Sequence, residues 1–280
     1  MVSPRTSTYT TLGLSIAAVA LVVSVQAAPR TDQATRLIVD ARQALGGDAL
    51  LSSIHSFTIK GSITRHGSIA RGPSGHGSFE IACDLPDKFV RRETTICPIL
   101  LPAADDMGPA CSPETTLLGI NGDQIVYEPR WTFLRDATLQ PLSPVKTSVR
   151  PLLLVQAQSD FIRVTLGLFA ASFHGAPVQF ADAPAAASRS AVIVSGDHIA
   201  GALFFDPLTH RPSSFGEYRY DDYRNVNGLM VPFRVARTND YSSTASPVRP
   251  EPSHDVEVWQ VREFRVNVAI DPKTFKPYVN

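Results

Sequence analysis

Apolar residues near the start of the chain follow a helical period and then change to a strand period. Between Thr31 and Leu45 they recur at helical spacing, at Ala34, Leu37, Ile38, Ala41 and Leu45. This spacing predicts an amphipathic helix that Thr31 or Asp32 caps at its start. The pair Gly46-Gly47 ends it, because glycine takes the left-handed cap conformation at low cost. A short turn of helix is expected at residues 48–53.

From Ser56 the apolar positions alternate with polar ones, which predicts a half-buried strand. Further strands are expected near residues 77–85, 88–95, 115–120, 191–195 and 202–205. The turn at Asn121–Asp123 joins the strand at 115–120 to another one at "QIVYEP" as a hairpin. Strands return about every ten residues with turn residues between them and without alternating helices. The sequence therefore predicts an α+β fold, mainly antiparallel β, with residues 28–280 forming one domain.

Two long segments in the middle of the chain lack the strand pattern. Residues 128–151 contain four prolines and are interpreted as a connection. Leu152–Phe173 is mostly apolar and predicts one or two buried helices. Its polar residues, among them Asp160 and Arg163, would be costly in a lipid bilayer, so a membrane span is not favoured.

The first residues have the three-part plan of a secretory signal peptide. Arg5 precedes an apolar run from Leu12 to Val25, and "VQAAPR" follows with a cleavage position after Ala27. A membrane anchor is the alternative, but the run has about 14 residues where roughly 20 are needed to span a bilayer. The mature protein, starting at Ala28, is therefore expected in a periplasm or outside the cell.

Charge and cysteine content narrow the function classes. With 26 basic and 26 acidic residues, the chain lacks the basic excess of a nucleic-acid-binding protein. An oxidising compartment makes the three cysteines disulfide candidates. Cys97 and Cys111 bracket a proline-containing loop and are the favoured bridge, with Cys83 to Cys97 second. Their spacing lacks the close pairs of a zinc site, so no metal is predicted.

The segment "YDDYRNVNGLMVPFRV", Tyr220 to Val235, places two adjacent carboxylates before an Asn-Gly turn. A two-residue turn would pair Asp221 with Arg234 and Asp222 with Phe233. Adjacent strand residues point to opposite faces, so Asp221 and Asp222 are not expected to converge on one metal or substrate. Asp221 is predicted to pair with Arg234, and Asp222 with Arg224 on the more apolar face.

Other candidate chemistry is sparse. The seven histidines include no His-x-x-x-His pattern, and "GPSGHG" around Ser74 lacks the glycine spacing of a nucleophile elbow. The glycines of "IVSGDHIAG" have no helix behind them, which argues against a phosphate-binding loop. The sequence therefore predicts no catalytic residues and no cofactor.

Four segments together resemble the periplasmic lipoprotein-carrier superfamily (LolA/LolB-like), in particular its divergent bacterial members. They are "ARQALGGDALLSSIHSFTIKGSI", "FFDPLTHRPSSF", "YDDYRNVNGLMVPFRV" and "FRVNVAIDPKTFKPY". The resemblance implies a curved antiparallel sheet, an incomplete β-barrel, with an N-terminal helix and one or two further helices packed on its concave face. It also implies an apolar cavity that takes up acyl chains. The cysteine-bearing loop and the proline-rich connection depart from this pattern.

Three functional hypotheses follow. The first is an exported non-catalytic protein that binds a lipid, a lipoprotein acyl chain or another apolar ligand. The second is an exported hydrolase using Asp222 with His210 or His254. The third is a cell-envelope protein-interaction module that uses a sheet edge near Pro232. For the first, Asp222 and Arg224 would form an ion pair at the cavity rim, and the candidate lining residues are Leu229, Val231, Phe233, Phe161, Leu166, Leu168 and Phe169.

Overall fold

A computed structural model provides the structure of the protein. It describes residues 33–66, 75–96, 114–128, 131–133, 139–141, 150–172, 178–183, 190–238 and 255–276. These residues belong to one compact unit, Thr31–Asn280. The signal peptide predicted at residues 1–27 lies outside the described residues.

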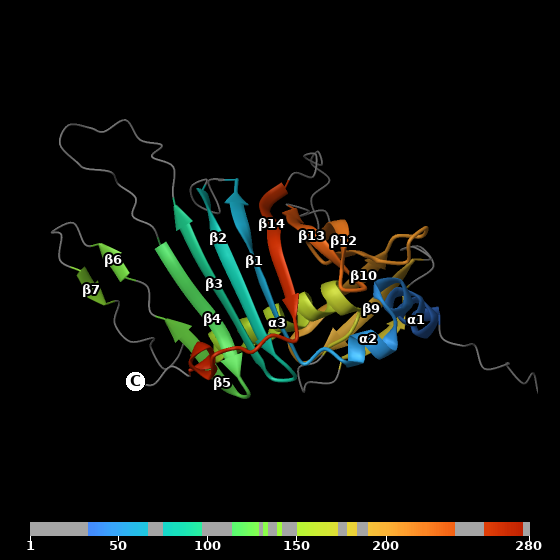
Figure 1. The fold of residues 1–280 in the computed structure, drawn as a ribbon, viewed down its shortest axis with the longest axis horizontal. Helices are drawn as coiled ribbons and strands as arrows, with labels where there is room; N and C mark the ends of the chain where they lie inside the picture. The colour runs from blue at the N-terminus through green and yellow to red at the C-terminus, as the bar shows by residue number, and fades with distance from the viewer. Residues whose placement is uncertain are drawn as a thin grey trace, which may run out of the picture. The chain divides into compact units, whose positions relative to one another are not determined.

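Most of the described chain forms one antiparallel sheet of twelve strands, in the order β5-β4-β3-β2-β1-β14-β13-β12-β11-β10-β9-β8 (Figure 1). The strands are β1 (Ser56–Arg65), β2 (Gly75–Asp84), β3 (Lys88–Ile96), β4 (Glu114–Asn121), β5 (Gln124–Glu128), β8 (Gln179–Asp182), β9 (Ala191–Gly196), β10 (Ile199–Phe205), β11 (Pro212–Phe215), β12 (Tyr218–Val226), β13 (Leu229–Thr238) and β14 (Asp255–Val266). β6 (Trp131–Phe133) and β7 (Leu139–Pro141) form a separate two-stranded sheet. The helical elements are α1 (Gln33–Leu45), α2 (Asp48–Ser52), α3 (Arg150–Phe169) and the 3₁₀ turn η2 (Pro272–Phe275).

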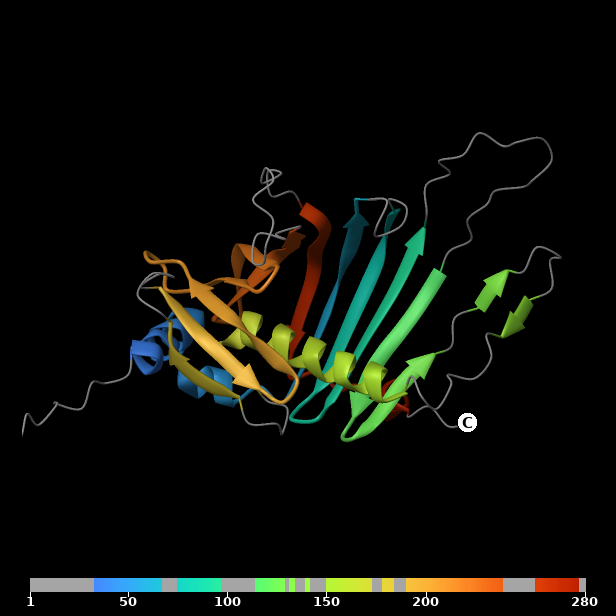
Figure 2. The same cartoon turned by 180° about the vertical axis from the view of Figure 1, so that it is seen from behind.

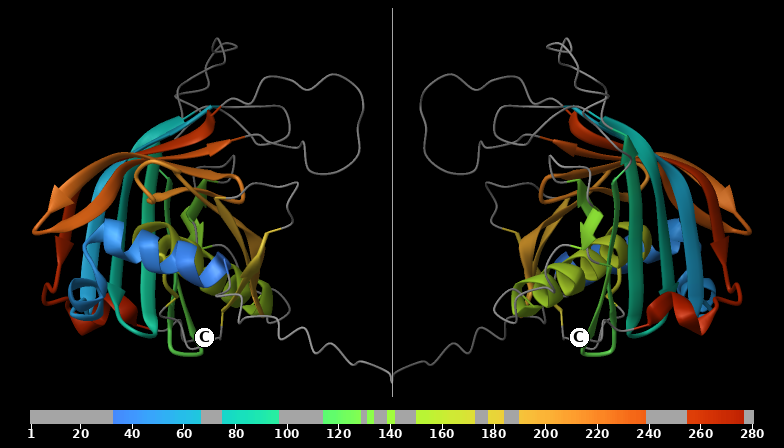
Figure 3. Two further views of the ribbon diagram at one scale, coloured as in Figure 1. Left: turned by 90° about the vertical axis from the view of Figure 1, so that its right-hand side faces the viewer. Right: turned by 90° about the vertical axis from the view of Figure 1, so that its left-hand side faces the viewer.

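The sheet is strongly curved and its edge strands, β5 and β8, do not pair with each other among the described residues. Figure 3 shows β1 to β4 on one side of the curve and β9 and β10 on the other, with α3 between them. β1 lies at the centre, between β2 and β14, so the first and last strands of the chain are neighbours. The expected α+β fold with a curved, unclosed antiparallel sheet is confirmed.

Helix α3 crosses the concave side of the sheet (Figure 2), and its buried side chains belong to the main apolar core. It contacts β3, β4 and β5 at one flank and β11 at the other. Phe161 stacks on Phe89 of β3 with ring centroids 5.4 Å apart, and Phe169 meets Phe57 of β1 at 5.3 Å. Each fully buried side chain of this size stabilises the fold by about 1.5–3 kcal/mol. By length and composition α3 could cross a membrane, but most of it is buried as a core helix.

Helix α1 packs against β8, β9 and β13 with its predicted apolar face, and Ala34, Ala41 and Leu45 are buried. The backbone N–H of Ala34 donates to Oδ1 of Asp182 on β8 at 2.7 Å, which satisfies one of the free donors at the helix start. The helix is described from Gln33 to Leu45, and the predicted cap residues Thr31 and Asp32 lie outside the described residues. It ends before Gly46, which has a positive φ of 135° as expected.

A smaller apolar cluster joins β2, β3, β4 and β5 to the C-terminal turn η2. Its buried members are Ala82, Val90, Leu117, Val126 and Phe275. Along β3, Val90 alternates with Phe89, which belongs to the main core, so η2 covers the opposite face of the sheet from α3. At Phe89 and Val90 this strand is therefore buried on both faces.

The strands expected from alternation are all present, with bounds shifted by a few residues. The stretch after Leu152 is a single helix that begins earlier, at Arg150, rather than two helices. β6 and β7 occur within the segment interpreted as a connection, and the periodicity did not predict β8. β8 is four residues long and mostly exposed, so it has too few apolar positions to give an alternating signal.

The hairpin register is the predicted one, with Asp221 opposite Arg234 and Tyr220 opposite Val235. The expected pairing of Asp222 with Phe233 is not formed, because these two residues are not partners in the β12–β13 ladder. Asp222 has a positive φ of 53°, a left-handed conformation that interrupts the regular strand. Alternation therefore cannot be followed through this residue.

Candidate ligand-binding cavity

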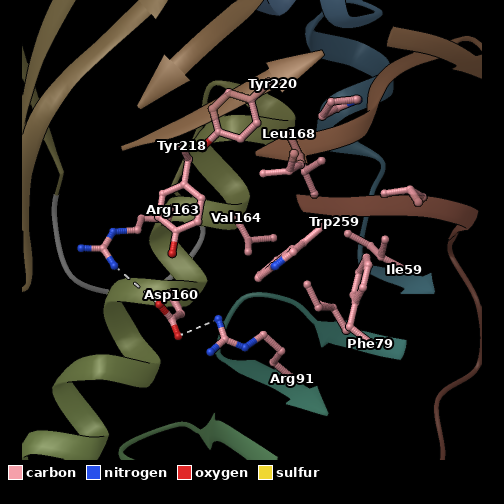
Figure 4. Close-up of a pocket in the computed structure, with 14 residues that line it drawn as sticks. Ile59, Phe79, Arg91, Asp160, Arg163, Val164, Leu168, Tyr218, Tyr220 and Trp259 are labelled. Atoms are coloured by element: carbon pink, nitrogen blue, oxygen red, sulfur yellow. Dashed lines mark ion pairs between the residues drawn. The ribbon is translucent and has the colours of Figure 1, made fainter. Parts of the chain in front are cut away.

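A cavity of about 50 Å³ lies between α3 and the concave face of the sheet (Figure 4). It is bounded by α3 on one side and by β1, β2, β3, β12, β13 and β14 on the other. Its lining is almost wholly apolar apart from one end. The lining residues are Ile59, Phe79, Ile81, Arg91, Asp160, Arg163, Val164, Leu168, Tyr218, Tyr220, Pro232, Val235, Trp259 and Val261.

Aromatic packing forms one wall of this cavity. Phe79 and Trp259 lie on strands that flank β1, and their ring centroids are 5.1 Å apart. Between them, Gly61 of β1 leaves the space that this contact needs, since a Cβ there would lie 2.7 Å from Cε1 of Phe79. The glycine therefore lets two large rings meet across the central strand.

The cavity is small because the concave face is filled largely by its own side chains. Phe79 and Trp259 are only 3% and 7% exposed. A volume of about 50 Å³ holds about three to five water molecules, by the measure that one needs roughly 10–15 Å³. A long apolar ligand would therefore have to displace side chains or shift α3.

A wider polar cleft of about 600 Å³ adjoins the apolar cavity. Four residues line both spaces, namely Arg91, Asp160, Arg163 and Tyr218. The cleft extends from them along the first half of α3, past Gln156 and Leu153, and over β1, β3, β13 and β14. The apolar cavity therefore borders, at its charged end, on a larger polar space.

Asp160 of α3 is the central charge where the two spaces meet. Its Oδ2 lies 3.0 Å from Nη1 of Arg91, and its Oδ1 lies 3.6 Å from Nη1 of Arg163 (Figure 4). Burial alone would lower the pKa of Arg91, but Asp160 and Glu93 outweigh burial and raise it. The guanidinium is thus charged, and it ties α3 to β3.

Further ion pairs continue from Arg91 along the cleft. Nε of Arg91 lies 3.1 Å from Oε1 of Glu93, and Arg65 pairs with both Glu93 and Glu257. Nε1 of Trp259 donates to Oε1 of Glu257 at 2.8 Å, which connects the network to the apolar wall. Buried charges are costly unless they are paired in this way.

The carboxylate of Glu257 is held in its ionised form. Burial would raise its pKa, but Arg237 and Arg65, together with hydrogen bonds from Arg65 and Trp259, lower it below the ordinary value. Burial raises the pKa of Tyr218, which lies beside the same charges, so its hydroxyl keeps its proton at neutral pH. The cleft therefore presents fixed charges and a neutral phenol.

Of the lining residues predicted from the sequence, Leu168 lines the cavity. Phe161, Leu166 and Phe169 are fully buried in the core around it. Leu229, Val231 and Phe233 are also in the main core but do not line the cavity. Near Leu229, a Cβ added at Gly46 would lie 3.5 Å from its Cα, so this end of the hairpin packs against α1. A ligand-binding role for these residues stays a prediction.

Asp222 and Arg224 form the expected ion pair, at 2.6 Å, but they line neither the cavity nor the cleft. A position for them at the rim of a binding cavity stays a prediction. Their side chains are 40% and 53% exposed, whereas Tyr220, two residues earlier, is buried. The left-handed backbone at Asp222 breaks the alternation that would have placed all three on one face.

Neither alternative hypothesis gains from the geometry. Pro232 is buried and lines the cavity, so it does not offer the exposed sheet edge that an interaction module would use. Hydrogen bonding to Arg224 lowers the pKa of Asp222, the proposed hydrolytic residue. His254 lies outside the described residues, as do Cys97 and Cys111. Cys83 is a buried free cysteine.

The sequence contained a signal for the charged end of the cavity that the periodicity argument did not use. Gln156, Asp160 and Arg163 interrupt an apolar stretch at spacings of four and three residues, which places them on one helix face. In β3, Arg91 and Glu93 share the face of the buried Phe89 by alternation. Which of these charges would meet depended on the curvature of the sheet. Among the described residues no group of acidic, histidine or cysteine side chains could hold a metal ion.

Comparisons with known proteins return similarity in structure only. No protein-family model and no curated protein matches the sequence. A LolA superfamily protein from Nitrosomonas europaea is similar with a TM-score of 0.44 and 14% identity, covering 87% of this chain and 97% of its own. A domain described as outer membrane lipoprotein-sorting, from Vibrio parahaemolyticus, has a TM-score of 0.42 and 9% identity over 85% of this chain and 94% of its own. A DUF1329 family protein from Desulfovibrio piger has a TM-score of 0.39 and 11% identity over 88% of this chain and 98% of its own. At these identities the likeness concerns the fold alone, and no residue's role is transferred.

Proposed function

We propose that the protein is an exported, non-catalytic binding protein for a lipid, a lipoprotein acyl chain or another ligand with an apolar chain. One observation carries the proposal: an apolar cavity under α3 adjoins a polar cleft, and four residues line both spaces. Binding sites for small molecules combine an apolar lining with a few placed polar groups in this manner. The apolar part would take the chain, and the cleft would take the polar end.

Entry of a chain requires the cavity to widen. Val164 and Leu168 project from α3 into the cavity opposite Trp259, so they are the side chains a ligand would displace (Figure 4). The first half of α3 is the more exposed one, with Leu152 at 69% and Val155 at 40%, while residues 165–169 are buried. A shift of α3 would therefore start at its exposed end, above the polar cleft.

The charges of the cleft support binding rather than catalysis. Arginine side chains pair with Glu93, Asp160 and Glu257. Glu257, whose pKa is lowered, stays ionised at neutral pH and is a poor general acid. A hydrolytic site would need a proton donor or a base whose pKa lies near the working pH.

Export belongs to the proposal because a periplasmic or extracellular location would bring the protein to lipids and lipoproteins of the cell envelope. Support comes from the amino-terminal sequence, where Arg5, the apolar run and Ala27 follow the plan of a cleaved signal peptide. A cell-envelope protein that delivers or receives the ligand is the partner this function implies. Amino-terminal sequencing of the exported protein should give Ala28 as its first residue.

Ligand extraction tests the binding function. The protein, purified from the compartment to which cells export it, should release an apolar molecule that mass spectrometry of an organic extract detects. After delipidation it should take up a hydrophobic dye. A folded protein that carries no apolar molecule and takes up no dye would contradict the proposal.

A matched pair of tryptophan variants locates the site. Val164→Trp fills the cavity and should abolish dye uptake, at a stability cost of about 1–3 kcal/mol for overpacking. Leu208→Trp adds the same ring at a side chain that is 89% exposed, in the turn after β10, and should bind dye as the wild type does. Circular dichroism establishes that both variants are folded.

A further inference from the structure

We infer that the ligand is an anionic amphiphile, whose phosphate or carboxylate headgroup is held in the polar cleft by Arg163 and Arg237. This inference rests on the proposed function, since it specifies the polar end of the ligand whose chain enters the apolar cavity. Three observations support it. The arginines of the cleft are more exposed than most of its acidic residues. Two arginines have N–H donors that no described residue uses, and one of these two lies where the cleft meets the cavity.

The cleft contains four arginines and four acidic residues, but they are not equally accessible. The acids at its base are covered, with side-chain exposures of 5% for Glu93, 6% for Glu257 and 8% for Asp160. The arginines above them are more open. Arg65 is 35%, Arg163 40% and Arg237 28% exposed. A ligand entering from solvent therefore meets guanidinium groups before it meets these three carboxylates.

Two of these arginines have donors that no group in the described part of the chain uses. Arg163 lies 3.6 Å from Oδ1 of Asp160, and Nη2 of Arg237 lies 3.6 Å from Oε2 of Glu257. Both distances exceed those of hydrogen bonds, which are about 2.7–3.2 Å. Nε of Arg237 is buried and has no hydrogen-bond partner among the described residues. A guanidinium offers five N–H donors in a planar fork that matches phosphate and carboxylate oxygens.

The position of Arg163 joins the headgroup to the chain. Arg163 lines both the cavity and the cleft, and the next residue, Val164, projects into the cavity. The guanidinium also lies over the ring of Tyr218, 6.0 Å from its centroid, at the same junction. An anion bound to Arg163 would thus place an attached apolar chain at the opening of the cavity.

Among the described residues, Glu217 is the acidic residue of the cleft that forms no ion pair with an arginine. It is half-buried and lines the same cleft as Arg237. Its negative charge should oppose binding of an anion. Removing this charge is therefore expected to strengthen the binding of an anionic ligand, whereas removing the charge of an arginine in the cleft should weaken it.

The experiment compares three probes with the same acyl chain in a dye-displacement assay on the delipidated full-length mature protein. They are a monoacyl glycerol phosphate, the fatty acid, and the neutral monoacylglycerol. At least one anionic probe should bind about tenfold more tightly than the neutral one, the ratio that a charge-assisted hydrogen bond of about 1.4 kcal/mol supplies. Added salt should reduce this preference. The comparison of phosphate with carboxylate identifies the headgroup.

Charge variants assign the preference to the cleft. Arg163→Gln should remove most of the preference for anionic probes, and Glu217→Gln should increase this preference. Arg237→Gln should act like Arg163→Gln, but it also weakens the contacts of buried Glu257, so Arg163→Gln is the decisive variant. Arg92→Gln, the same change at an exposed arginine on β3 outside the cleft, should leave the preference intact.

Equal affinity of the wild-type protein for neutral and anionic probes would overturn the inference and leave the proposed function standing. Loss of the preference in Arg92→Gln as well as in Arg163→Gln would also overturn it, since the effect would then come from overall charge. If the wild-type protein binds none of the three probes, the proposed function itself fails.

Discussion

Gly167 of α3 and Tyr220 of β12 are in such close contact that no other residue fits at the helix position. A Cβ at Gly167 would lie 2.4 Å from Cε1 and Cζ of the tyrosine ring. The glycine costs about 1 kcal/mol of helix propensity relative to alanine. In return the tyrosine ring packs directly on the helix backbone, at the closed end of the apolar cavity.

Gly167→Ala should therefore destabilise the protein although it raises helix propensity. We expect a net loss of up to about 2 kcal/mol in the free energy of unfolding, because overpacking costs about 1–3 kcal/mol and helix propensity returns about 1 kcal/mol. Urea denaturation measures the change. In a double-mutant cycle, Gly167→Ala should cost much less when Tyr220→Ala has removed the ring. If Gly167→Ala destabilises the Tyr220→Ala variant as much as the wild type, the contact with the tyrosine ring is not the cause of the destabilisation.

Acid should destabilise the protein through Glu257. Arg237 and Arg65 outweigh burial and lower the pKa of this carboxyl in the folded state. The native state therefore binds this proton less readily than the unfolded state does, so its contribution to stability is complete above the unfolded pKa of about 4.3. The contribution is lost as the pH falls from there through the lower folded value.

Urea unfolding between pH 7 and pH 3 measures this dependence. Glu257→Gln should reduce stability at pH 7. It should also flatten the dependence of unfolding free energy on pH below the unfolded pKa of about 4.3, where the loss in the wild type begins. Asp222→Asn is the matched control, because Asp222 also has a lowered pKa but lies in an exposed ion pair with Arg224. Surface pairs contribute little, so its slope should resemble the wild type. The same flattening in both variants would contradict the role of Glu257.

Breaking the ion pair between Asp160 and Arg91 should destabilise the protein more than replacing both residues by apolar ones. Asp160→Asn leaves Arg91, which is 17% exposed, with Glu93 as its remaining partner. We expect a loss of about 3 kcal/mol in unfolding free energy, the lower end for breaking a buried pair. Replacing both residues, Asp160→Leu with Arg91→Met, should recover most of it. A double variant as unstable as Asp160→Asn would show that the pair stabilises more than its apolar replacement.

Ligand binding should change the emission of Trp259, since its ring lines the apolar cavity. The chain has two tryptophans, so Trp131→Phe leaves Trp259 as the only one. In that variant a fatty acid titration should shift the emission maximum and saturate. A titration that displaces the dye but leaves the emission unchanged would place the ligand elsewhere.

Cysteine chemistry tests the predicted Cys97–Cys111 disulfide. The thiol of Cys83 is buried, and burial raises its pKa well above the ordinary value, so it should resist labelling until the protein unfolds. Peptide mapping without reductant should show Cys97 linked to Cys111. A link that includes Cys83 would contradict both statements.

The order of elements was determined by the local sequence. Alternation in β1, the helical spacing before Gly46 and the Asn227-Gly228 turn each fixed an element through interactions among near neighbours. The ion pairs of Asp221 with Arg234 and of Asp222 with Arg224 could also be predicted, because hairpin register and short separation bring them together. These are properties of period and turn geometry, which the sequence carries directly.

The site was decided by the tertiary structure. Arg91, Asp160 and Glu257 come from β3, α3 and β14, and only the curvature of the sheet around α3 places them in one network. The same curvature put Pro232 and Trp259 on the cavity wall. The sequence by itself determined which segments are strands or helices and which residues can be neighbours within a hairpin. Contacts between distant segments depend on how far the sheet bends and where one helix crosses it, and no local period encodes either quantity.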